Sequence, residues 1–140
     1  MQADAPQTVH LADYTAPNWW VEKVELAFDL HPTATRVRSK IRFKRNPDAA
    51  GRDLHLDGEN LSLITLAVDG KHLTENEYRK TDTSLTVPGD TLPQDAFTWE
   101  AEVEINPEAN TALEGLYMSN GMFCTQCEAE GFRKITYYPD

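Results

Sequence analysis

The residues with the clearest chemical potential lie near the end of the chain, in the segment Cys124-Thr125-Gln126-Cys127-Glu128. In an extended strand alternate side chains share a face, so Gln126 and Glu128 would project together. An amide oxygen beside a carboxylate is a good acceptor pair for an ammonium group, because hydrogen bonds between charged groups are the strong kind. The spacing is therefore compatible with a site for a positively charged amine. On spacing alone, however, an exposed surface acid and a strand-bonding amide are the simpler explanation.

Cys124 and Cys127 are the only cysteines, and their C-x-x-C spacing is also typical of redox and zinc motifs. A redox pair favours a helix N-terminus, and a structural zinc site needs four ligands, of which this spacing supplies two. None of the four histidines lies close to the pair in the sequence. We therefore expect two buried or half-buried thiols in place of a redox or metal site.

Motifs for hydrolytic catalysis are missing from the chain. It contains no H-E-x-x-H, no G-x-S-x-G and no phosphate-cradling glycine loop. The candidate site offers one carboxylate and no partnered histidine. We therefore expect recognition of a ligand by this chain alone, with no catalytic residue and no metal ligand in it.

The elements that must position the candidate site are strands. Apolar and polar residues alternate in three segments, 21–30, 35–44 and 97–105, which is the periodicity of a half-buried strand. Asp69-Gly70 and Asn120-Gly121 are two-residue hairpin signals. Shorter strand-like segments are expected at 54–57, 61–68, 71–73, 78–80 and 84–87, and a helical turn at 108–113.

No stretch of ten or more residues has a helical stripe. Strand after strand at short spacing predicts an all-β fold, either an antiparallel β-sandwich or a curved, saddle-like sheet. We expect this domain to span residues 13–140, truncated at its C-terminal end, after a loose arm over residues 1–12. A targeting signal and a membrane-length apolar run are both missing, which favours the cytosol.

Charge is distributed unevenly along the chain. The net charge is −10, and the window 81–132 holds ten acids and no Lys or Arg, whereas the rest has thirteen of each sign. An acidic half around an amine site would attract cationic peptide ends and repel nucleic acid. The alternating bases of 35–44 lie opposite acids of 21–30 in the expected hairpin, so we interpret them as a solvated face, and Glu100, Glu102 and Glu104 likewise.

The terminal segment also carries a family resemblance. Leu113-Glu114-Gly115-Leu116-Tyr117 and the run Thr125–Arg133, TQCEAEGFR, resemble the N-terminal domain of the zinc aminopeptidase N family, above all its bacterial cytosolic branch. The opening Tyr14-Thr15-Ala16-Pro17 fits more loosely. The resemblance implies that Gln126 and Glu128 bind the free amino end of a peptide substrate.

The resemblance further implies that the chain is a fragment of a longer zinc metallopeptidase of the alanyl aminopeptidase type. The zinc and the catalytic residues would then lie beyond this chain, in a catalytic domain of the same polypeptide. An alternative is a stand-alone β-sandwich module that binds carbohydrate or protein. That alternative predicts an aromatic platform, such as Trp19, Trp20 and Tyr117, on a solvent-facing sheet.

Overall fold

The computed structural model describes residues 17–127 and 131–139. Within these ranges, ten strands form three antiparallel sheets, joined by turns and short 3-10 helices. The expected all-β antiparallel fold is therefore confirmed. The arm predicted over residues 1–12 lies outside the described residues, as does Glu128.

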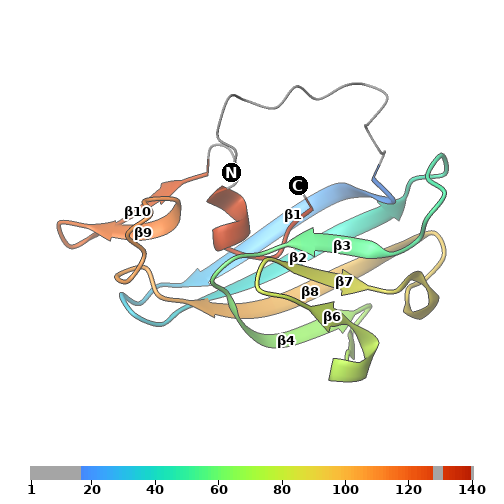
Figure 1. Cartoon of the computed structure of the whole chain (residues 1–140), viewed down its shortest axis with the longest axis horizontal. Helices are drawn as coiled ribbons and strands as arrows, with labels where there is room; N and C mark the ends of the chain where they lie inside the picture. Colours follow the sequence, from blue (N-terminus) through green and yellow to red (C-terminus); the bar gives the residue numbers. More distant parts are fainter. Residues whose placement is uncertain (1–16, 128–130, 140) are drawn as a thin grey trace.

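One layer of the fold is a five-stranded sheet with the order β1-β2-β8-β4-β5. Strand β8 lies between β2 and β4, so segments far apart in the sequence become neighbours (Figure 1). The strands are β1 (Trp19–Asp29), β2 (Thr35–Arg45), β8 (Ala96–Ile105), β4 (Ser62–Val68) and β5 (Lys71–His72).

A second, smaller sheet with the order β3-β7-β6 covers one face of the first. The turn before β6 and the turn after β7 are short 3-10 helices. These elements are β3 (Leu54–Asp57), η2 (Glu75–Glu77), β6 (Arg79–Lys80), β7 (Ser84–Val87) and η3 (Gly89–Thr91).

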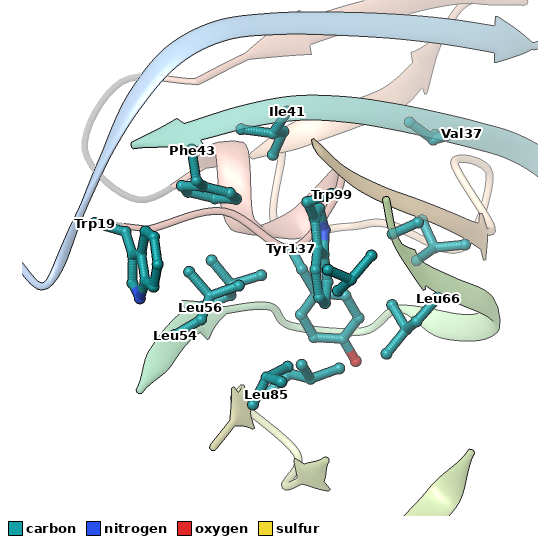
Figure 2. Packing of buried hydrophobic residues seen from close by; sticks show 14 of the residues in the cluster. Trp19, Val37, Ile41, Phe43, Leu54, Leu56, Leu66, Leu85, Trp99 and Tyr137 are labelled. Carbon is teal, nitrogen blue, oxygen red and sulfur yellow. The ribbon is translucent and has the colours of Figure 1, made fainter. Parts of the chain in front are cut away.

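The core lies between the two sheets, where β2 and β8 each bury every second residue. Trp99 of β8 and Tyr137 of the C-terminal segment both point into this space (Figure 2). Trp19 is only 3% exposed and meets the ring of Phe97 edge-on at 4.8 Å. Because Trp19 is buried, its predicted place in a solvent-facing aromatic platform is wrong, whereas Trp20 is 43% exposed.

The outer face of the large sheet is a ladder of alternating charge, because the basic strand β2 lies between acids of β1 and of β8. Arg36 donates from Nε to Glu104 Oε1 at 3.0 Å and from a terminal nitrogen to Glu102 at 2.9 Å. These hydrogen bonds raise the pKa of Arg36. Both glutamates lie on the outer face of the sheet, as expected, and there they also pair with Arg36. The facing pairs are Glu25–Lys40, Asp29–Arg36, Lys40–Glu100, Arg38–Glu102 and Arg36–Glu104.

Residues 108–113 do not form the expected helical turn; after β8 the chain makes a turn at 107–109 and continues without regular structure. The side chain of Asn110 determines this path, because its Nδ2 donates to the carbonyl oxygens of Glu114 at 2.6 Å and Leu116 at 2.9 Å. A side-chain amide that bonds the backbone ahead of it competes with helix formation. Among the described residues, no helical segment has the length and apolar character of a membrane span.

Candidate functional site

The candidate site lies on a β-hairpin at one end of the molecule. Strands β9 (Gly115–Ser119) and β10 (Met122–Gln126) pair antiparallel, and Figure 1 shows the hairpin extending beyond the sandwich at the left of the view. Asn120 has φ 51° and Gly121 has φ 79°, the left-handed conformations that a two-residue hairpin turn requires. The hairpin expected from Asn120-Gly121 is therefore confirmed.

Gln126 is the last residue of β10, and its side chain is exposed. In the hairpin register it lies opposite Gly115, the first residue of β9. Glu128 lies outside the described residues, so the predicted alignment of the two side chains stays a prediction. The described part of the site therefore contributes the side-chain amide of Gln126 at the end of a paired strand.

The backbone around Gln126 is fixed by two glycines that leave no room for a side chain. A Cβ on Gly131 would collide with the carbonyl oxygen of Gln126 and stand 3.2 Å from the nitrogen of Gly115. A Cβ on Gly115 would stand 2.9 Å from Cβ of Lys134, and Gly115 itself has φ 73°. Three chain segments therefore meet at backbone contact, which we call the glycine contact (Gly115, Gln126 and Gly131).

A short 3-10 helix, η4 (Gly131–Lys134), starts at the glycine contact and is attached to the sandwich by ion pairs. The Arg133 guanidinium lies 3.5 Å from both the Asp57 and the Glu59 carboxylates, and Lys134 Nζ lies 3.4 Å from Glu59. The side chains of Arg133 and Lys134 are both 14% exposed, so water screens these pairs only partly. We call these four residues the anchor cluster.

The chain after η4 continues the attachment into the core. The backbone of Tyr138 exchanges two hydrogen bonds with Asp57 at the end of β3, at 2.9 and 3.0 Å. The ring of Tyr137 packs where a side chain on Gly58 would otherwise lie. Burial raises the pKa of the Tyr137 hydroxyl, with a smaller contribution from Tyr78. The position of η4, and with it the glycine contact, is thus tied to β3.

Sequence reasoning found Gln126 but missed these supports. The anchor cluster joins residues more than seventy positions apart, so local spacing carried no signal of it. The only available signal was the pair of glycines that flank the motif, since a glycine in an ordered segment often marks close approach of two backbones.

The two cysteines are free thiols that differ in exposure. Cys124 is half-buried, as expected, but Cys127 is exposed because it follows the end of β10. The expectation that both would be at least half-buried is therefore wrong for Cys127. Within residues 17–127 and 131–139, no three His, Cys, Asp or Glu side chains are grouped so that they could hold a metal ion.

Both the sequence and the structure of this chain are similar to those of known aminopeptidases. Proteins named aminopeptidase N are 49% identical over 140 residues in Caulobacter vibrioides, 40% over 135 in Escherichia coli and 37% over 128 in Haemophilus influenzae. These alignments cover 100%, 96% and 91% of this chain. They cover only 16%, 15% and 14% of the relatives' own lengths.

The structure gives a consistent result. A crystal structure of Legionella pneumophila aminopeptidase A in complex with aspartic acid superposes with a TM-score of 0.82 and 35% identity, over 93% of this chain and 15% of that one. No protein-family model matches the chain. The resemblance found in the sequence is confirmed by these relatives.

Proposed function

We propose that this chain, which is homologous over its whole length to the N-terminal region of aminopeptidase N, recognises the free amino end of a peptide substrate. Gln126 and Glu128 are the proposed acceptors of the substrate ammonium. An exopeptidase needs such a group, because the ammonium must be held where the first peptide bond meets the catalytic centre. A carboxylate there also disfavours longer chains that have no charged end at that position.

The observation that supports this role is the rigid mounting of Gln126. An exposed amide on a free loop would sample many positions, whereas Gln126 ends a paired strand and its carbonyl lies against Gly131. Recognition residues work best when neighbouring contacts hold them in place. Aspartic acid, present in the Legionella relative's crystal structure, is itself an amino acid with a free ammonium group.

We further propose that catalysis depends on zinc held by a separate catalytic domain of the same polypeptide, acting in the cytosol. The described residues of this chain fit no metal site, since they contain no suitable group of ligands. The zinc would polarise the peptide carbonyl and activate water, as it does in metallopeptidases generally. The present chain would orient the substrate toward it.

The proposal is tested in the full-length enzyme with Glu128→Gln, which keeps the shape of the side chain and removes its charge. We expect kcat/KM for an amino-acid p-nitroanilide to fall by the equivalent of about 2–5 kcal/mol, since the charge pair with the substrate is lost. Gln126→Ala should have a smaller effect of about 1 kcal/mol, typical of a neutral hydrogen bond.

Thr125→Ala is the matched control, because Thr125 is exposed on the same strand. It should leave kcat/KM within about twofold of the wild type, well under 1 kcal/mol. An unchanged kcat/KM in Glu128→Gln would refute the assigned role.

A further inference from the structure

Two arginines line one pocket at the end of the sandwich opposite the hairpin. The pocket has a volume of about 360 Å³ and is formed by Arg45, Pro47, Arg52, Gln94 and Asp95. It lies beside the start of β8 at Ala96, whereas the hairpin follows the end of β8 at Ile105. The pocket is therefore separate from the candidate peptide site.

Trp19 contacts the side chain of Arg45 and the backbone of Arg52. The Arg45 guanidinium lies over the Trp19 ring at 6.0 Å, and its backbone N–H donates to the Asp95 carbonyl at 2.7 Å. On the other side, Trp19 Nε1 donates to the Arg52 carbonyl at 2.9 Å. A Cβ on Gly89 would stand 2.9 Å from that same carbonyl group, so Arg52 is also closely packed. The Arg45 side chain is further restrained by the Trp19 ring and the Arg52 side chain by a hydrogen bond to the Leu92 carbonyl, so both lose little freedom if they bind a ligand.

The guanidinium groups retain unused hydrogen-bonding capacity. Each has one terminal nitrogen bonded to a backbone carbonyl, Ala49 for Arg45 at 3.4 Å and Leu92 for Arg52 at 3.2 Å. The Nε atoms of both are buried without a partner. Leaving a buried donor unsatisfied is costly, more so when it belongs to a charged group.

Charge is also uncompensated at this place. Among the ion pairs of the described residues, none includes Arg45 or Arg52, although Asp95 lines the same pocket. Two cations therefore border one pocket with a single acid that pairs with neither. This contrasts with Arg36, which bonds two glutamates.

We propose that this pocket binds a small tetrahedral oxyanion, with phosphate as its simplest form. A planar guanidinium presents paired N–H donors that match the oxygen spacing of such anions, and two of them supply the charge. The Gln94 amide can donate an additional hydrogen bond. Asp95 opposes the anion and keeps its affinity moderate.

Titration of the 140-residue chain with inorganic phosphate, at ionic strength held constant with chloride, tests the proposal. We expect saturable backbone amide NMR shifts confined to the pocket residues and their neighbours. Arg52→Gln should weaken phosphate binding at least about tenfold, since it removes one of two charges beside the ligand. Asp95→Asn should strengthen binding about fivefold by removing the opposing charge.

Arg79→Gln is the matched control, because Arg79 is an exposed arginine on β6 and lies outside the pocket lining. It should change phosphate affinity less than twofold. Shifts that fail to saturate up to tens of millimolar phosphate would overturn the proposal. So would equal loss in Arg79→Gln and Arg52→Gln, or an Asp95→Asn variant that gains nothing. None of these results depends on peptide recognition at the hairpin.

Discussion

The sharpest prediction tests the glycine contact. Substitution of three glycines in and near the hairpin separates the effect of a steric clash from the effect of backbone strain. Gly131→Ala adds a Cβ that collides with the Gln126 carbonyl, without a positive φ at Gly131. Gly121→Ala has the positive φ of 79° and nothing within 4 Å. Gly115→Ala combines both effects, with φ 73° and Cβ of Lys134 at 2.9 Å.

The magnitudes follow from these geometries. Gly121→Ala should lower the free energy of unfolding by about 1–2 kcal/mol, the cost of a left-handed conformation. Gly131→Ala should cost about 1–3 kcal/mol, as overpacking against backbone does. Gly115→Ala should exceed either, at about 2–4 kcal/mol, because it combines the two costs.

Function distinguishes the variants more strongly than stability does. Relief of the Gly131 clash must move the end of β10, so Gln126 is displaced, and displacement of a positioning group by about 1 Å can cost about a hundredfold in rate. In the full-length enzyme we therefore expect Gly131→Ala to lower kcat/KM about a hundredfold, whereas Gly121→Ala leaves it unchanged.

Urea unfolding of the 140-residue chain, followed by tryptophan fluorescence, measures stability, and p-nitroanilide hydrolysis measures kcat/KM. If Gly131→Ala were as active as Gly121→Ala at equal stability, the glycine contact would not position the site. An equal loss of kcat/KM in both variants would mean that hairpin stability alone governs activity.

Two further predictions concern the supports of the site. Arg133→Met removes the ion pairs to Asp57 and Glu59 but keeps most of the apolar stem of the side chain. It should lower the free energy of unfolding, measured by urea denaturation, by about 1–3 kcal/mol. Adding 1 M salt to the wild type should reproduce only part of this loss, because partly buried pairs are incompletely screened. The pKa of Tyr137 is raised above its usual value of 10.0 in the folded state. The folded protein therefore keeps the Tyr137 proton at a pH where the unfolded chain has begun to lose it. The stability that this contributes is complete below pH 10 and is lost as the pH rises through the folded pKa. A fall in melting temperature above pH 10 that Tyr137→Phe reduces would confirm this, and identical alkaline profiles for the two proteins would contradict it.

Local features of the fold could be predicted from the sequence because local physics determines them. The alternation of apolar and polar residues in β2 and β8 located both strands to within a residue. Over about ten residues, apolar residues at every second position fit a strand and do not fit the 3.6-residue period of a helix. The Asn120-Gly121 turn was predictable because few residue pairs accept two positive φ angles. In each case the deciding residues are neighbours in the chain.

The sheet order could not be predicted, because it depends on pairing between distant segments. Acids of β1 opposite bases of β2 were expected and are found, as in Glu25 opposite Lys40. However, the ion pairs of Arg36 are made with β8, which approaches from the other side. The acids of β8 and the bases of β2 therefore face each other in one sheet. This pairing is missed when each strand is interpreted alone.

The edge strand β1 shows another limit of sequence patterns. Phe28 is 39% exposed and Leu30 is 50% exposed, although both continue the apolar alternation of Val24 and Leu26. Periodicity reports which residues share a face, but it does not report whether another layer covers that face. The β3-β7-β6 sheet has shorter strands than the large sheet, and the end of the apolar face at Phe28 and Leu30 is exposed.

The position of Gln126 illustrates why the supports of a site are harder to predict than the site itself. A two-stranded hairpin is marginally stable alone, so β9 and β10 cannot fix a side chain by their own pairing. Precision must come from contacts outside the hairpin: Asn110 bonded to the Leu116 carbonyl, Gly131 against Gln126, and η4 attached through Arg133. Substitutions at these distant residues should therefore impair substrate recognition without touching the substrate, in proportion to how far they let the end of β10 move.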